Sequence, residues 1–169
     1  MRLATFLSTT LIAIAAAFAA QAAPLGPVAV VHVTIGPQLQ DKADEYGQQE
    51  LDYLAADLKD SVERALERSG GLKPSGGTLD LVIEDALPNR PTMRQMNIKP
   101  GLSYESFGIG GAKVGGVLTT PDGRQVSVGY GWYETDIRWS EGASTWMDAL
   151  NTFDRFARRL VTGEAVLDH

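Results

Sequence analysis

The chain of 169 residues contains no cysteine. This absence excludes disulfide bonds, thiol nucleophiles and thiolate metal sites, and it removes the residue that carries the lipid of a bacterial lipoprotein. We therefore expect no lipid anchor. A hydrophobic core, rather than cross-links, must stabilise the fold.

Histidine and positive charge are also scarce. His32 lies inside an apolar run and His169 is the last residue, and neither belongs to a group of acids at ligand spacing. We expect no metal site and no cofactor, and we interpret His32 as a packed core residue. The 15 Lys and Arg residues are outnumbered by 21 Asp and Glu residues. Because binding to phosphates needs clustered positive charge, we expect no nucleic-acid partner.

The longest hydrophobic run lies at the N-terminus. Met1-Arg2 precedes it, residues 3–20 form an apolar run that includes Ser8, Thr9 and Thr10, and Ala20-Gln21-Ala22 has the small-x-small pattern of a signal-peptidase site. The segment predicts a signal peptide over 1–22 that is cleaved after Ala22, which would make the mature protein periplasmic or secreted. A retained N-terminal anchor is the alternative.

Residues 23–169 are sufficient for a single globular α+β domain. Nearly continuous β-branched residues over 28–35 predict a strand buried on both faces. Apolar residues at helical spacing over 46–69 and 145–162 predict two amphipathic helices. Alternation over 78–87 predicts a second strand.

A β-hairpin follows, with arms over 107–120 and 124–138 around a Pro-Asp-Gly turn. The apolar alternation changes phase in each arm, which predicts bulges near Gly110-Gly111 and near Trp132-Tyr133. The elements together predict an α+β two-layer sandwich in the order β-α-β-(long loop)-β-β-α. We expect a mixed sheet of about four strands with two helices on one face.

The glycine-rich stretch over 108–116 does not fit a phosphate-binding loop, because it continues into a hairpin and not into a helix. Glycines in paired strands usually mark bulges or a close approach of other atoms to the backbone. A ligand carrier that uses this glycine-rich sheet face is one further hypothesis.

The segment 88–106 is a long Pro-rich loop, which exceeds the usual length of a connection. It gathers basic and apolar side chains, namely Arg90, Met93, Arg94, Met96, Lys99 and Tyr104. Arg, Met and Tyr are enriched in interface cores, and proline reduces the entropy lost on binding. The loop favours a non-catalytic accessory protein that binds an envelope protein partner. Alternatively, the loop packs its own Met and Tyr side chains over one end of the sheet. The oligomeric state is left open.

Three carboxylates support a different functional hypothesis, a small envelope enzyme or binder that acts on glycan through Asp85, Glu134 or Asp136. General acid–base chemistry needs two acids in different environments, and aromatic residues next to Glu134 could stack on a sugar. For Glu134 and Asp136, a solvated ladder with Arg138 is the alternative. For Asp85, the alternative is a cap at a strand end.

Short motifs in the hairpin and the last helix carry a family resemblance. The hairpin reads Gly-Gly-Ala-x-Val-x-Gly from position 110 and Thr-x-Asp-Gly-Arg from position 120, and the helix contains Arg-Phe-Ala-Arg-Arg-Leu from position 155. With the leader, these motifs resemble small exported proteobacterial envelope proteins of unknown function, many of them lipoproteins. The resemblance implies an envelope location and no catalytic residues. This chain departs from the lipoprotein members because it lacks the lipidated cysteine.

Overall fold

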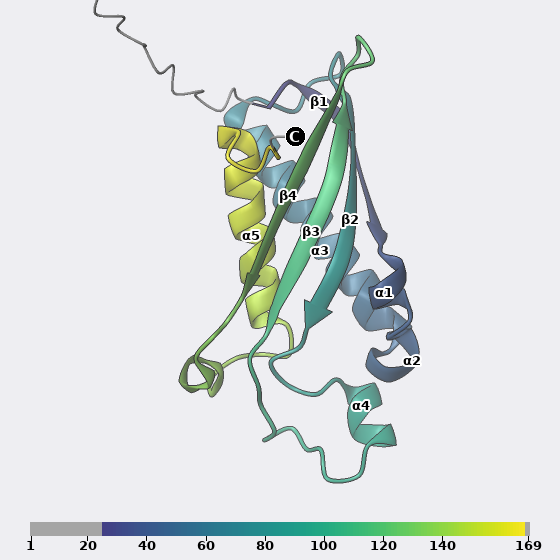
Figure 1. Cartoon of the computed structure of the whole chain (residues 1–169), viewed down its shortest axis with the longest axis vertical. Coiled ribbons are helices and arrows are strands. Elements are labelled where there is room, and N and C mark those ends of the chain that lie inside the picture. The colour runs from purple at the N-terminus through teal and green to yellow at the C-terminus, as the bar shows by residue number, and fades with distance from the viewer. Residues whose placement is uncertain (1–24, 168–169) are drawn as a thin grey trace, which may run out of the picture.

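The computed structural model of the protein describes residues 25–167 (Figure 1). The predicted signal peptide, its cleavage site and His169 lie outside the described residues. Among the helices within 25–167, none is both long and apolar enough to cross a membrane.

Four strands form one open sheet. They lie in the order β1-β2-β3-β4, with the bounds β1 Val28–Ile35, β2 Gly77–Leu87, β3 Gly111–Thr119 and β4 Gln125–Tyr133. β1 is parallel to β2, whereas β2 pairs with β3 and β3 with β4 in antiparallel fashion. The mixed sheet of four strands confirms the predicted α+β fold class.

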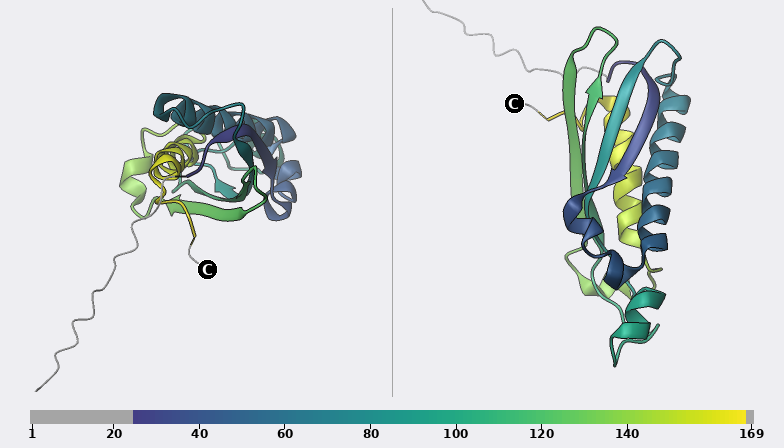
Figure 2. Two further views of the ribbon diagram at one scale, coloured as in Figure 1. Left: turned by 90° about the horizontal axis from the view of Figure 1, so that it is seen from above. Right: turned by 90° about the vertical axis from the view of Figure 1, so that its right-hand side faces the viewer.

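Two long helices, α3 (Gln48–Ser69) and α5 (Met147–Thr162), cover one face of this sheet (Figure 2). Two short helices, α1 (Pro37–Gln40) and α2 (Ala43–Tyr46), connect β1 to α3. Both long helices end at a glycine in the left-handed region, where the missing side chain removes the steric penalty. The four strands and two long helices follow one another in the order that the apolar periodicity predicts, with the short helices between them.

The core lies between the sheet and the two helices. Its largest fully buried side chains include Leu51, Leu54 and Leu58 of α3, Leu79, Leu81 and Ile83 of β2, and Phe153, Phe156 and Leu160 of α5. The helical residues recur every three or four positions and the strand residues every two, so each set falls on one face of its element. Each such side chain contributes about 1.5–3 kcal/mol when it is buried.

β1 is an edge strand, and the prediction that it is buried on both faces was wrong. Val28 and Val31 are buried, whereas Val30 and His32 are exposed. The Nδ1 atom of His32 lies 3.0 Å from Oδ1 of Asp80 on the neighbouring strand. His32 is therefore part of an exposed polar pair and not a core residue.

The two predicted bulges were also wrong. β3 and β4 pair in unbroken register from Gly111–Tyr133 to Thr119–Gln125. The phase changes arise because both strands are shorter than predicted, so that the outlying apolar residues 107, 109, 137 and 139 lie outside the sheet. The register is irregular elsewhere in the sheet, in β1 between Val28 and Val30 and in β2 between Ile83 and Asp85. In β2 the irregularity is a shift against β3. This shift buries Ala86 and leaves the Asp85 carboxylate partly exposed.

Candidate functional site

One end of the molecule is built from the segment between β2 and β3, the 3₁₀ helix η1 (Ile137–Ser140) and the start of α5 (Figure 1). The predicted long loop is not free of secondary structure, because it contains α4 (Met93–Ile98). The hydroxyl of Thr92 accepts the Gln95 N–H at 3.2 Å, and the Gln95 side chain accepts the Thr92 N–H at 3.0 Å. This capping box explains why a six-residue helix begins here.

Arg90 fastens the long segment to the chain that precedes α5. Its guanidinium donates to the carbonyl oxygens of Ala143 at 2.7 Å, Tyr104 at 2.8 Å and Glu141. The same group lies 5.7 Å from the ring centre of Tyr104 and 5.9 Å from that of Phe107. Arg90 therefore holds two stretches of backbone, at Tyr104 and at 141–143, and two aromatic rings in place.

A buried polar clamp beneath this end joins Asn89 to Asp148, and the two side chains are only 1% and 8% exposed. The Asn89 amide donates to the Asp148 carboxylate at 2.5 Å, and the Asp148 N–H donates to the Asn89 amide oxygen at 3.0 Å. The Gly110 N–H donates to the same carboxylate at 3.2 Å. Because every bond is shielded from water, the clamp fixes the segments before and after the long loop against the first turn of α5.

The clamp leaves no room for a side chain at Gly110. A Cβ atom there would lie 2.5 Å from the Asn89 amide oxygen, whereas a Cβ at Gly108 would meet nothing within 4 Å. We expect Gly110→Ala to lower the free energy of unfolding by about 2 kcal/mol, because the Asn89 side chain must move and lose buried hydrogen bonds. Gly108→Ala is the matched control. Equal stability of the two variants in chemical denaturation would contradict the clamp.

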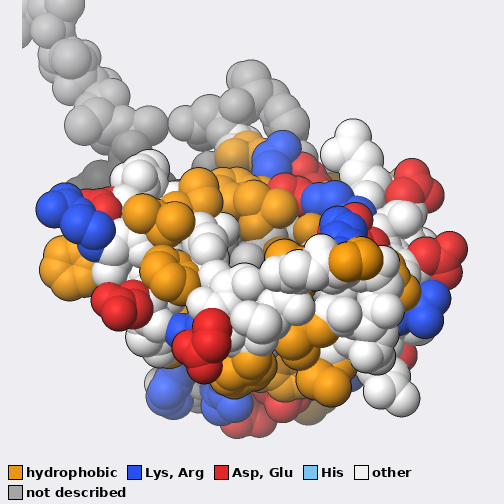
Figure 3. Space-filling model, turned by 90° about the horizontal axis from the view of Figure 1, so that it is seen from below, with side chains coloured by type: hydrophobic (Ala, Val, Ile, Leu, Met, Phe, Trp, Pro, Cys, Tyr) orange, Lys and Arg blue, Asp and Glu red, His pale blue; other side chains and the backbone are white. Residues whose placement is uncertain are grey.

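Large apolar side chains are exposed at this end, which Figure 3 shows from below with hydrophobic groups spread among charged ones. We call this surface the apolar end and define it by Met93, Ile98, Tyr104, Phe107, Ile109, Ile137, Trp139 and Met147, which are between 39% and 76% exposed. Trp139 is the most exposed of them. Of the eleven large apolar side chains exposed within 25–167, eight belong to this set. Concentrated exposure of this kind is typical of interaction surfaces.

A cleft of about 480 Å³ opens at the apolar end. Its walls include three prolines, Pro88, Pro91 and Pro100, together with Leu102 and Phe107. The volume falls within the range of about 300–1,000 Å³ that is typical of pockets for small ligands or inserted side chains. Because three of its walls are proline, the cleft loses little backbone entropy when it is filled.

The six residues predicted for binding have different surroundings in the structure. Met93 and Tyr104 are exposed at the apolar end, and Met96 is partly buried. Arg90 stabilises the loop as described. Arg94 donates to the Asp44 carbonyl at 3.1 Å, and the Lys99 ammonium lies 2.6 Å from the Glu45 carboxylate, so both contact the α2 segment.

Sequence reasoning missed most of the apolar end. The sequence predicts Phe107, Ile109 and Ile137 in the hairpin arms, Trp139 directly after the second arm and Met147 in the last helix. The available signal was the loss of strand alternation at these positions, which we interpreted as bulges. The helix α4 was also missed. Its capping box lies between Pro91 and Pro100, and we interpreted the whole Pro-rich segment as a loop.

The three carboxylates of the glycan hypothesis each have local partners. The Asp85 carboxylate accepts from Lys42 and from the Tyr133 hydroxyl, both at 2.8 Å. The Glu134 carboxylate accepts the N–H groups of residues 135 and 136 in the turn after β4. Asp136 pairs with the Arg138 guanidinium at 2.9 Å, also beyond the strand. Each of the three carboxylates therefore has hydrogen-bond partners within the fold, so none of them needs a ligand to explain its position.

The Asp85 network predicts a dependence of stability on pH. Burial acts to raise the pKa of the Asp85 carboxyl, but hydrogen bonds from Lys42 and Tyr133 outweigh it and hold this pKa below its ordinary value. The ionised carboxylate therefore stabilises the fold at neutral pH, and this contribution is lost as the pH falls through the lowered pKa. We expect the stability advantage of the wild type over Asp85→Asn to shrink below about pH 4.

Urea unfolding of both proteins at several pH values measures this advantage. Asp41→Asn, at an exposed position, is the control. A wild-type advantage that stayed constant down to pH 3 would show that the Asp85 charge is not involved.

On the sheet face that the helices do not cover, neighbouring groups fill the space beside the glycines. A Cβ at Gly115 would lie 2.3 Å from the Glu84 carboxylate, and a Cβ at Gly129 would lie 3.1 Å from Leu167. A Cβ at Gly131 would lie 3.3 Å from the aliphatic stem of Lys113. These contacts support close approach, rather than a ligand-binding floor, as the reason for the glycines.

No model of a protein family matches this chain, and no curated protein matches its sequence.

Proposed function

We propose that the protein is an exported, non-catalytic accessory protein that binds an envelope protein partner through the apolar end. The observation that carries this proposal is the gathering of eight exposed apolar side chains at one end of the molecule, where Phe107 also lines a proline-walled cleft. Side chains that protrude in this way lose contact with water when a partner covers them, and aromatic residues among them contribute most of the binding energy.

The rigidity of this end also supports binding. Arg90 and the Asn89–Asp148 clamp hold the loop segments in one arrangement before any partner arrives. A surface that is already ordered gives up less conformational entropy on association, so more of the contact energy is realised as affinity. We expect the partner to insert an apolar or aromatic side chain into the cleft.

Removal of the protruding side chains of η1 tests the binding surface. We expect the double variant Ile137→Ser/Trp139→Ser to recover at least about ten times less of a single dominant envelope protein after in-cell crosslinking and affinity purification, because truncated interface aromatics commonly cost 2 kcal/mol or more. Tyr53→Ser, which removes an exposed aromatic on α3, is the matched control. Both variants should melt as the wild type does, since all three side chains are exposed.

Two results would contradict the proposed partner class. Equal recovery of the partner by the double variant would place the interface elsewhere. Flotation of the purified protein with phospholipid vesicles, lost in the double variant, would show that the apolar end binds a lipid surface instead of a protein.

Export rests on the leader and has its own test. Fractionation of the native host followed by mass spectrometry should find a chain that begins at Ala23 outside the cytoplasm. A full-length chain recovered from the cytoplasm would contradict export without affecting the binding surface.

The glycan alternative has less support from the geometry. Trp132 and Tyr133 are the aromatic residues beside Glu134, and the guanidinium of Arg155 lies 4.0 Å from the Trp132 ring centre. One face of the Trp132 ring is thus covered by a side chain of α5, and the Tyr133 hydroxyl donates to Asp85. Together with the occupied carboxylates, these contacts favour binding over glycan chemistry.

A further inference from the structure

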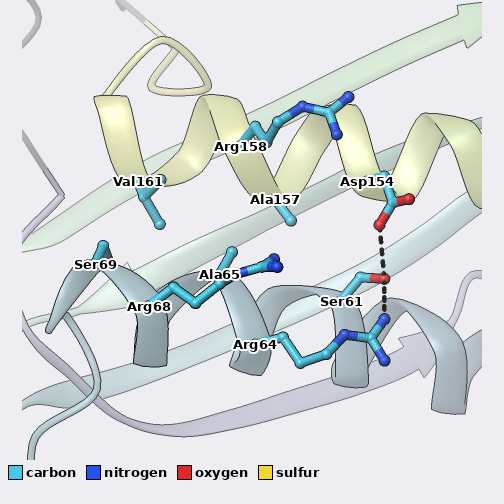
Figure 4. Close-up of a pocket in the computed structure, with 9 residues that line it drawn as sticks. All are labelled: Ser61, Arg64, Ala65, Arg68, Ser69, Asp154, Ala157, Arg158 and Val161. Carbon is cyan, nitrogen blue, oxygen red and sulfur yellow. Dashed lines mark hydrogen bonds between the residues drawn. The ribbon is translucent and has the colours of Figure 1, made fainter.

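The outer surface of the helix layer carries a groove that has no part in the proposed function. α3 and α5 run in the same direction, because the Trp146 indole N–H donates to the Glu50 carboxylate near their N-termini and the Ser61 hydroxyl donates to the Asp154 carboxylate farther along. A groove of about 660 Å³ lies between them (Figure 4). Ser61, Ala65 and Ala157 contribute small side chains to it, so that another surface can approach closely.

The charges along this groove are divided by sign. Asp154 lines the groove nearer the N-terminal half of the helices, and Asp57 lies close enough for its carboxyl group to interact with the charge of Asp154. Towards the C-terminal ends the groove is lined by Arg64, Arg68 and Arg158. The guanidinium groups of Arg68 and Arg158 make no hydrogen bond or ion pair with any residue in the described part of the chain. The acidic half is crowded: burial raises the pKa of the Asp57 carboxyl, and the charges of Asp154 and Asp60 add to the rise while Arg64 opposes it.

The two groups of charge are centred at one level of the helix pair. On α3, Asp57 and Arg68 each lie about 8 Å along the axis from a point between residues 62 and 63. On α5, Asp154 and Arg158 each lie about 3 Å from residue 156. The bond between Ser61 and Asp154 sets these two midpoints side by side.

We propose that this face binds a second copy of the chain. The two copies are related by a two-fold axis that lies in the interface, perpendicular to α3 and α5, at the level of the two midpoints. The axis places Arg68 of each copy opposite Asp57 of the other, and Arg158 opposite Asp154. It turns the helices antiparallel across the interface, so their dipoles also attract. The small side chains lie near the axis together with Arg64, whose guanidinium donates to the Ser61 hydroxyl of its own copy at 3.0 Å. One surface patch therefore supplies both halves of every contact, as a two-fold interface requires.

Charge reversal distinguishes this dimer from any other. Asp57→Arg and Arg68→Glu should each raise the dissociation constant of the dimer by about tenfold or more. Each substitution places like charges at positions 57 and 68, and the two-fold symmetry makes this contact occur twice in the dimer. An equimolar mixture of the two variants should form a mixed dimer, since Arg at position 57 then faces Glu at position 68. The double variant Asp57→Arg/Arg68→Glu should likewise regain dimerisation.

Sedimentation velocity over a concentration series of the purified protein measures these constants, and thermal melting verifies that each variant is folded. A wild-type protein that stays monomeric overturns the proposal. A dimer that tolerates both single reversals, or that fails to form in the mixture, overturns this interface. Dimerisation that is lost in Ile137→Ser/Trp139→Ser but not in the charge variants would assign the contact to the apolar end. The test is independent of the proposed function, because the two surfaces lie on different parts of the molecule.

Discussion

Leu58→Asp is expected to abolish folding. Leu58 lies in the middle of α3 with none of its surface exposed, among side chains of the sheet and of α5. The substitution removes a buried leucine, at a cost of about 2–5 kcal/mol, and places a carboxyl group where no hydrogen-bond partner awaits it. Together these two losses are comparable with the whole free energy of unfolding of a typical domain, about 5–15 kcal/mol. Circular dichroism should show no cooperative melting transition.

Ala56→Asp provides the control for this prediction, because residue 56 lies on the exposed side of the same helix. It should lower the free energy of unfolding by less than about 1 kcal/mol, which reflects helix propensity alone. A Leu58→Asp protein that melted like Ala56→Asp would overturn the assignment of the core.

Asn89→Ala is expected to produce the largest loss of stability among polar substitutions. It leaves the Asp148 carboxylate buried without the amide that donates to it at 2.5 Å, and it releases the Asp148 N–H. The Gly110 N–H remains as a donor to the carboxylate. Loss of a hydrogen bond to a buried charge costs more than loss of one to a neutral group, so we expect a loss of about 3 kcal/mol and a fall in Tm of about 10 °C. Calorimetry measures both quantities.

The same substitution should loosen the apolar end more than the rest of the fold. The Asn89 side chain also donates to the Gly108 carbonyl at 3.3 Å, so its removal loses side-chain bonds to both the segment after the long loop and the start of α5. Hydrogen exchange of residues 93–110 should accelerate, whereas that of β2 and β3 should change less. Asn97→Ala, at an exposed position on α4, is the control. Uniform acceleration in both regions would show that the clamp has no local role.

The helices and the order of the elements could be predicted because their signals are local. In α3, Leu51, Leu54 and Leu58 recur at helical spacing and meet the core without irregularity. The strands were harder to interpret. The apolar sequence of β1 resembles that of a central strand, yet its position at the sheet edge is decided by pairing with residues almost fifty positions away. The alternation of apolar and polar residues shows which side chains share a face of a strand. It does not show which of the two faces another element buries.

The candidate site depends on long-range contacts that no local pattern reveals. The apolar end combines residues from three separate stretches, 93–109, 137–139 and 147, and the clamp joins positions 89 and 148. Arg90 illustrates the difficulty, since an arginine among methionines is typical of an interface, but here it binds main-chain carbonyls of its own chain. The composition of the loop therefore indicated the end of the molecule where exposed apolar side chains gather, without distinguishing supporting residues from exposed ones.

Site-specific photocrosslinking in the native host tests the binding surface most directly. A photoreactive phenylalanine analogue would replace Trp139 at the apolar end in one strain and Asp122, in the β3–β4 turn at the opposite end of the sheet (Figure 1), in another. We predict that irradiation joins one dominant envelope protein to the probe at position 139 and none to the probe at position 122. A partner captured at position 122 but not at position 139 would contradict the assignment of the apolar end as the binding surface.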